Sequence, residues 1–402
     1  MANTINTHQL LAREAAAVLE EESPFLSNIN KGRESDFGRD VGGYKTGDNI
    51  DISIPPVGVV FNGETFAGGG SATDVTERRV NLKLDIRKHI GVQFSAKEKA
   101  LDVTEFRERI LRPQIRTLAS TIEAEMIKRA VKATFNLVGT AGSVPSTVKA
   151  HSQARAQMEA FLAPVSDRSH LITSGAMVEI VDATKGLFQK QTIDSGLIRG
   201  ALGELLGADW YEHQSLPAIT NGSQATGFTV DGAAQTGSSL AVKSLTSTNT
   251  LSAGQVFTIA GVNRAHPLTG EDAGELQQFV VTADFTASGT TGTLSITPGI
   301  RPTGPNKTVT ASPANSAVVT LVGSVSTAYR QNLMFQRDAF AAAFADLPVL
   351  AGCEGYSTRT PGGIALRVMT FGDGKADVEG TRIDVLAGFA AVRPEHACRI
   401  TE

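Results

Sequence analysis

Residues 102–136, DVTEFRERILRPQIRTLASTIEAEMIKRAVKATFN, decide the fold. Asp102 and Glu105 have the spacing of a capping box at a helix start. Apolar residues then recur at steps of three or four, apart from one gap, at Val103, Phe106, Ile110, Leu118, Ile122 and Met126. This pattern predicts one amphipathic helix of about thirty residues, roughly 45–50 Å long. Pro113 is expected to kink it, because proline lacks a backbone donor and clashes with the preceding turn. We call this segment the spine helix.

The stretch before the spine helix has an unusually long alternation. Between residues 80 and 94 the apolar side chains fall on even numbers, with Lys88 as the exception: Val80, Leu82, Leu84, Ile86, Ile90, Val92 and Phe94. A period of two over about fifteen residues predicts a strand on the order of 50 Å long. Ile50, Ile52 and Ile54 alternate in the same way. We therefore interpret residues 48–95 as a long two-stranded ribbon with a glycine-rich tip.

A ribbon of this kind has no core of its own and is marginal in water unless its apolar row is covered. The row can pack on the body of its own chain, or it can lie across a second copy. We favour the second copy, because the ribbon and the spine helix are both long for one compact domain of average build.

The N-terminal segment predicts a short amphipathic helix over residues 8–20 that runs into Glu20-Glu21-Glu22. This acidic end would suit a basic partner, or it is a solvated helix end.

After the spine helix, strands and helices alternate in an α+β pattern. We expect helices over 151–162, 176–188 and 194–206, and strands over 169–174 and 208–220.

At Asn221 the composition changes, and it stays changed to about Val325, with Ser, Thr, Gly, Ala and Val dominant. Short alternating runs recur there, at 239–245, 255–262, 276–285, 292–300 and 316–323. Evenly spaced short strands predict a small all-β barrel or sandwich, inserted between the two halves of an α+β body. Helical periodicity returns over 326–344, and a strand hairpin of 364–371 with 381–394 closes the chain.

The overall composition limits the function classes. A chain of 402 residues can bury two or three cores, and its net charge of −4 with a pI near 6.0 offers no basic patch for tight nucleic-acid binding. The sequence has no apolar run of membrane-spanning length and no signal peptide, so we expect no membrane partner. Two cysteines, Cys353 and Cys398, are too few for a disulfide scaffold and are expected to be reduced thiols.

No motif for catalysis or cofactor binding stands out. The seven histidines lack zinc-site spacing, and there is no phosphate loop, nucleophile elbow or dinucleotide fingerprint. The best metal candidate is Asp373, Asp377 and Glu379, but Lys375 sits where an acidic ligand is needed, so a hairpin turn is favoured. We therefore predict no enzyme activity, no catalytic residue, no cofactor and no metal.

The order of these parts resembles the major capsid (coat) protein of tailed double-stranded DNA bacteriophages. The similarity is to the P22-type branch, in which an HK97-like fold carries an inserted β-barrel. It is carried by the MANT start, by FRERILRPQIRTLASTIEAEM (106–126), by NLMFQRDAFAAAFADLP (332–348) and by RIDVLAGFAAVRPEHACRI (382–400).

The resemblance implies a function and partners. Such proteins form the pentamers and hexamers of an icosahedral procapsid around a scaffolding protein, with a portal protein, and the shell expands as DNA is packaged. The shell would contain that DNA non-specifically. It would be assembled in the host bacterial cytoplasm, and the protein would reside in the virion. The ribbon would lie over a neighbouring subunit, and the insertion would sit outside and touch adjacent capsomers.

The predicted domains are an N-terminal arm (1–35), the extended two-stranded loop (36–98), the spine helix with the first part of the body (99–220), the inserted all-β domain (221–325) and the second part of the body with its hairpin (326–402). The alternative function is a virion-surface adhesin or glycan-binding protein that uses the inserted β domain. An adhesin would need neither the spine helix nor the ribbon.

Overall fold

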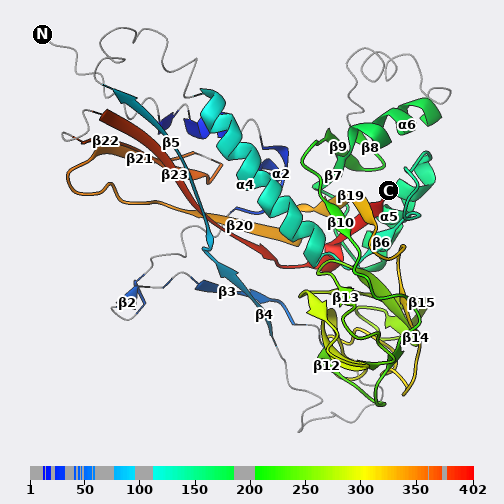
Figure 1. The fold of residues 1–402 in the computed structure, drawn as a ribbon. Coiled ribbons are helices and arrows are strands. Elements are labelled where there is room, and N and C mark those ends of the chain that lie inside the picture. Colours follow the sequence, from blue (N-terminus) through cyan, green and yellow to red (C-terminus); the bar gives the residue numbers. More distant parts are fainter. Residues whose placement is uncertain are drawn as a thin grey trace, which may run out of the picture. The chain divides into compact units, whose positions relative to one another are not determined.

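The computed structural model describes residues 12–13, 15–19, 23–31, 40–41, 44–45, 47, 49–56, 58, 77–95, 112–184, 204–360, 362–373 and 378–402. Helices and sheets are mixed, and strands predominate in this part of the chain (Figure 1), in agreement with the α+β prediction. The chain divides into two compact units. The first comprises Met1–Ile52, Val80–Ile127 and Phe340–Val392, and the second Ser53–Arg79, Lys128–Ala339 and Arg393–Glu402.

The helices are α2 (Pro24–Ser27), α4 (Arg112–Ala133), α5 (Val148–Ala160) and α6 (Ser174–Thr184), with the 3-10 turns η3 (Arg337–Ala339) and η4 (Pro394–His396). Residues 12–13 and 15–19 are also helical, within the predicted N-terminal helix. The strands that precede α4 are β1 (Asp40–Val41), β2 (Tyr44–Lys45), β3 (Asn49–Ile54), β4 (Arg78–Lys83) and β5 (Ile86–Ser95).

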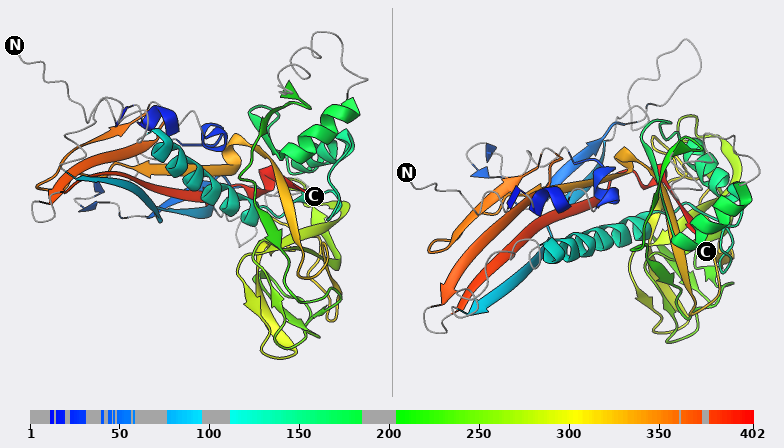
Figure 2. Two further views of the ribbon diagram at one scale, coloured as in Figure 1. Left: turned by 45° about the horizontal axis from the view of Figure 1, so that its top comes forward. Right: turned by 90° about the horizontal axis from the view of Figure 1, so that it is seen from above.

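The first unit is built on a five-stranded sheet. Its strands are β20 (Phe340–Ala345), β21 (Glu354–Arg359), β22 (Ala365–Asp373) and β23 (Val378–Ala391), in the order β20-β23-β22-β21, with β5 paired to β23. The predicted C-terminal hairpin is confirmed, because β22 and β23 are antiparallel and run side by side as the orange and red strands of Figures 1 and 2.

The strand character predicted for residues 80–94 is confirmed, but one continuous strand is not. The chain breaks at Leu84 and Asp85, between β4 and β5. Only β4 pairs with β3, whereas β5 pairs with β23 over Ile86 to Ser95. The two-stranded ribbon in the described part is therefore shorter than the sequence indicates.

Part of the apolar row packs on its own chain in the first unit, and its expected contact with a second copy stays a prediction. Leu82 and Ile52 are buried with Ala341, Ala343 and Ala390 of the same chain, and Val80 and Leu84 pack against this cluster. Leu82 and Ile86 of the row are buried within the chain, whereas Ile90 and Val92 remain partly exposed. The predicted glycine-rich tip between β3 and β4 lies outside the described residues, except for Gly58.

The spine helix is confirmed as α4 over Arg112–Ala133, while residues 102–111 and the predicted cap lie outside the described part. Pro113 is the second residue of the described helix, so the predicted kink stays a prediction. Ile115, Leu118 and Ile122 are buried, as the periodicity requires. Glu123 is buried among them and accepts a 2.8 Å hydrogen bond from the backbone N–H of Phe25 in α2.

The second unit contains a seven-stranded sheet in the order β6-β24-β19-β7-β9-β8, with β10 also paired to β19. These strands are β6 (Leu137–Val138), β7 (Arg168–Ile172), β8 (Glu204–Leu205), β9 (Ala208–Glu212), β10 (Ala218–Thr220), β19 (Ala328–Gln336) and β24 (Ala397–Thr401). Helices α5 and α6 confirm two of the predicted helices, and β7 confirms the strand over 169–174. The single strand predicted over 208–220 is instead two strands, β9 and β10, which pair with β7 and β19.

Two sequence predictions of helix are wrong. Residues 326–344 form β19, η3 and β20, because β19 lies inside its sheet and is buried almost throughout, so it shows no alternation. The predicted helix 194–206 does not reach its expected end, since Glu204–Leu205 form β8 and turn into β9 at Gly207. Residues 194–203 lie outside the described part.

The segment 221–325 is all β. It contains β11 (Thr229–Val230), β12 (Gly237–Lys243), β13 (Thr250–Leu251), β14 (Val256–Ala265), β15 (Asp272–Val281), β16 (Phe285–Thr286), β17 (Thr291–Ile300) and β18 (Val319–Leu321). Six of these strands form the order β11-β12-β17-β15-β14-β18. A bridge between Thr229 and Val318 joins the first strand to the segment that leads into the last, so the sheet closes on itself (yellow-green in Figure 2).

The closed sheet surrounds a large apolar core. Its fully buried side chains include Phe228, Leu240, Phe257, Phe279 and Leu294, and the rings of Phe257 and Phe279 stack with centroids 5.6 Å apart. Burial of this cluster stabilises the segment through the hydrophobic effect.

Candidate interaction site

The described residues contain no candidate metal centre. Among them, no group of three or more His, Cys, Asp or Glu side chains could hold a metal ion. Asp373 pairs with Val378 at the end of the β22–β23 hairpin, as the turn interpretation requires, and Asp377 lies outside the described part. In the part of the chain that the structure describes, no helix is long and apolar enough to cross a membrane.

The most strongly perturbed titratable groups are buried in the second unit. Burial lowers the pKa of His151 from 6.5 to about 4, and burial followed by the nearby His151 lowers the pKa of His170 well below 6.5. Burial also raises the pKa of the Cys398 thiol and lowers the pKa of Arg399 to about 9. Because these side chains are enclosed, they are parts of the core and are not placed to meet a substrate.

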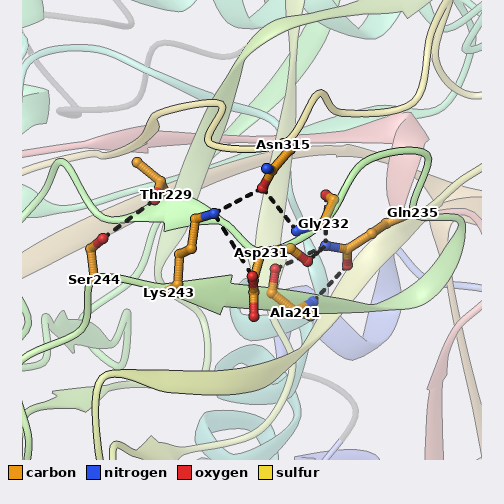
Figure 3. Close-up of polar contacts among 8 residues, drawn as sticks. All are labelled: Thr229, Asp231, Gly232, Gln235, Ala241, Lys243, Ser244 and Asn315. Atoms are coloured by element: carbon orange, nitrogen blue, oxygen red, sulfur yellow. Dashed lines mark hydrogen bonds and ion pairs between the residues drawn. The ribbon is translucent and has the colours of Figure 1, made fainter.

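The best-defined exposed feature is the loop of residues 231–236, which joins β11 to β12 (Figure 3). Asp231, Ala233 and Ala234 are exposed, whereas Val230 and Leu240 at the loop's base are buried in the core of the closed sheet. Gly232 has a φ of 89° and Ala234 a φ of 57°, so the backbone turns tightly at the tip.

The side chain of Gln235 holds this loop closed from within. Its Nε2 donates to the carbonyl oxygens of Asp231 at 2.6 Å and Ala241 at 3.0 Å, and its Oε1 accepts from the N–H of Ala241 at 2.7 Å (Figure 3). The carboxamide therefore satisfies backbone groups that would otherwise need water or another strand.

A second set of contacts fastens the loop to Asn315. The Oδ1 of Asn315 accepts from Lys243 Nζ at 2.8 Å and from the N–H of Gly232 at 3.1 Å (Figure 3). Lys243 Nζ also lies 3.8 Å from Asp231 Oδ1. This half-exposed ion pair contributes at most about 1 kcal/mol to stability. The N–H of Ala234 donates to the carbonyl of Pro313 at 3.1 Å.

The loop is thus both exposed and ordered. A surface whose backbone is already fixed loses little conformational entropy when it binds, and the small side chains at its tip let another backbone come close. The sequence pattern predicts a strand over 239–245 but does not identify this loop as a site. The signal was the Asp231-Gly232 pair, because Asp-Gly between alternating apolar runs is a strong hairpin indicator.

Two other candidates from the sequence lie outside the described part, namely the acidic run of residues 20–22 and most of the ribbon tip.

Comparison with known families decides the assignment. Residues 45–399 match the family model described as P22 coat protein, gene protein 5. The chain belongs to the P22 coat protein family. It is a major capsid protein that forms an icosahedral shell with copies of itself, and it is a component of the virion shell. Its role is structural, in agreement with the sequence prediction.

This coat protein is also similar to solved phage capsids. It resembles a structure of Mycobacterium phage Che8 at 14% identity and a TM-score of 0.47, over 94% of this chain and 90% of that one. A capsid structure of cyanophage P-SCSP1u has 12% identity and a TM-score of 0.45, over 94% and 87% of the two chains. The capsid of Ralstonia phage GP4 has 9% identity and a TM-score of 0.45, over 94% and 90%. No curated protein sequence matches the chain.

Proposed function

We propose that this coat protein forms the pentamers and hexamers of a phage head that begins as a procapsid and matures into a DNA-filled capsid, without catalysis. Family membership supports this role. Its further partners are a scaffolding protein during assembly, a portal protein and double-stranded DNA contained non-specifically. Assembly takes place in the host bacterial cytoplasm. A net charge of −4 is consistent with loose containment of DNA, since few counterions would be released on contact.

The proposed architecture is an HK97-like fold with an inserted domain at 221–325. The closed sheet and separate core of that segment support it. The proposed boundaries of the other parts are 1–35, 36–98, 99–220 and 326–402. The break at Leu84 and Asp85 indicates that the 36–98 segment joins the five-stranded sheet at its C-terminal end.

We infer that the loop 231–236 is a contact of the insertion with neighbouring copies in the shell. The single observation that carries this inference is an exposed tip whose backbone is fixed by Gln235 and Asn315. Weak contacts suffice at such a site, because a closed symmetric shell repeats each contact many times.

The test is to substitute Ala233→Arg and to express the variant with its scaffolding protein. Arginine at the exposed tip is expected to leave the subunit soluble and folded, because the side chain points away from the core. It should lower the yield of shells in negative-stain micrographs about ten-fold, since a bulky charge must be desolvated at the contact.

The matched control is Ser288→Arg, which places the same side chain in another exposed turn of the insertion. Shells at wild-type yield from Ala233→Arg would overturn the role of this loop. Wild-type chain that stayed in small oligomers and bound glycans would instead favour the adhesin alternative.

A further inference from the structure

The insertion, residues 221–325, contacts the rest of the second unit, here called the body, through a junction that buries few apolar side chains. The apolar cluster there is small. It consists of Phe135, Leu137, Val256 and Val280, with Phe161 and Val322 packed against it. The core inside the insertion is much larger. Burial of apolar area supplies most of the stabilising free energy. The junction is therefore less stable than the insertion that it joins to the body.

Gln278 makes one polar contact of the junction, which also contains a buried hydrogen bond of 2.8 Å from Arg399 Nη1 in β24 to the carbonyl of Gly254. Its Oε1 accepts from the N–H of Leu137 at 2.7 Å, and its Nε2 donates to the carbonyl of Leu137 at 2.8 Å. Leu137 is in β6, which ends the order of the seven-stranded sheet and pairs with β24 on its other side. The carboxamide of Gln278 therefore takes the position that a further strand would occupy. It satisfies the backbone N–H and carbonyl of Leu137 at this edge of the sheet.

Arg264 makes another contact. Its Nη1 donates across the junction to Gln157 Oε1 of α5 at 3.0 Å, and within the insertion its Nη2 lies 3.3 Å from Oε2 of Glu275 in β15. Its guanidinium carbon lies 5.1 Å from the centroid of the Phe161 ring. A cation over an aromatic face adds attraction when it is partly removed from water.

The junction is not close-packed. A cavity of about 260 Å3 is lined by Arg264, Gln157, Gln278, Asn136 and Phe161, among others. The buried Nε of Arg264 has no hydrogen-bond partner among the described residues. A polar cavity of this size admits several water molecules, each with a share of liquid volume of about 30 Å3. Water can therefore replace the contacts of Gln278 and Arg264, and opening exposes only the small apolar cluster of the junction.

We propose that Gln278 and Arg264 form a latch that fixes the orientation of the insertion on the body and that opens while both parts stay folded. A polar contact beside a hydrated cavity opens at a lower free energy than an apolar core, so the junction opens more readily than the core of the insertion. The latch concerns how the insertion is held, and it stands whether or not the loop 231–236 contacts a neighbour.

Hydrogen exchange of the unassembled full-length chain tests the latch. The Gln278→Ala variant is expected to exchange the amide of Leu137 about ten-fold faster, the change that the loss of one or two hydrogen bonds produces. Amides of β12 and β17, inside the insertion, should keep wild-type rates. Gln278→Glu keeps the acceptor for the Leu137 N–H but loses the donor to its carbonyl, so its effect should be intermediate.

The matched control is Gln235→Ala. It removes another carboxamide that clamps backbone in the same segment, so it should accelerate only the loop 231–236 and Ala241. Unchanged exchange at Leu137 in Gln278→Ala would overturn the latch. Equal acceleration throughout the insertion would overturn it too, because the junction and the core would then open together.

Arg264→Met keeps the test decisive if Gln278→Ala fails to fold. Methionine can still pack on Phe161 but loses the bonds to Gln157 and Glu275. The latch predicts faster exchange of the Leu137 amide, which Arg264 does not itself bind, with β12 and β17 protected. Loss of protection in β12 and β17 would contradict it.

Discussion

Three aromatic rings in the second unit show how single residues depend on their surroundings. The ring centroids of His151 and His170 lie 4.9 Å apart, and that of Trp210 lies 4.3 Å from His170. Both histidines are fully buried, and none of their ring nitrogens has a hydrogen-bond partner among the described residues. A proton on either ring would place an uncompensated charge in the core.

This cluster predicts a loss of stability in mild acid. Burial lowers the folded pKa of His151 from 6.5 to about 4, so between these pH values the unfolded chain binds a proton that the fold excludes. Stability is therefore complete above pH 6.5 and falls as the pH drops toward 4, by on the order of 3 kcal/mol for His151 alone. Urea unfolding at pH 7.0, 5.5 and 4.5 measures this slope.

The variant His151→Leu should lose part of the pH dependence, because leucine cannot titrate while the buried His170 still does. Trp210→Phe is the control, since it alters the third ring and keeps both imidazoles, so its pH slope should remain. If wild type and His151→Leu show the same slope, the buried imidazole is not the cause.

At the level of elements, Gly388 lies against the point where the strand of residues 80–94 breaks. A Cβ at Gly388 in β23 would lie 2.5 Å from the carbonyl oxygen of Lys83. Lys83 is the last residue of β4, and β5 begins at Ile86. The close approach of the two backbones is possible because position 388 has no side chain.

Gly388→Ala is therefore expected to destabilise the unassembled subunit by about 1–3 kcal/mol, since the rigid backbone of Lys83 must move away. Chemical unfolding followed by circular dichroism measures the change. Gly372→Ala is the matched control in the same sheet, because nothing lies within 4 Å of a Cβ there. An equal effect of the two substitutions would argue against the close contact.

The same elements show what the sequence could and could not predict. Period two identified β3, β4 and β5, and period 3.6 identified α4 and α5, because each buries one face. The break at Leu84 has no signal in the local alternation, and it lies against Gly388, far along the chain. The strand β19 was mistaken for a helix because it is buried on both faces and so has no alternation. The loop 231–236 depends on Gln235 and Asn315, and side-chain clamps of this kind have no periodic signal.

For the whole molecule, the insertion has the features of a separate folding unit. Its two ends lie together, because Asn221 Nδ2 donates to the carbonyls of Val322 at 2.9 Å and Ser324 at 3.1 Å. Its closed sheet leaves no long unpaired edge between β11 and β18. Adjacent termini and an enclosed core are what allow a domain to be inserted into another chain without disturbing either.

Residues 223–323 expressed alone are therefore expected to fold and to unfold in one cooperative thermal transition. The core about Phe257 and Phe279 supplies the cohesion, so Phe257→Ala should cost about 3–5 kcal/mol and abolish or sharply lower the transition. Leu276→Ala is the control, since Leu276 is 44% exposed and its loss should change stability little. A disordered circular dichroism spectrum of the isolated wild-type segment would show that the body supplies part of its stability, and the boundary at 221–325 would then not mark an independent domain.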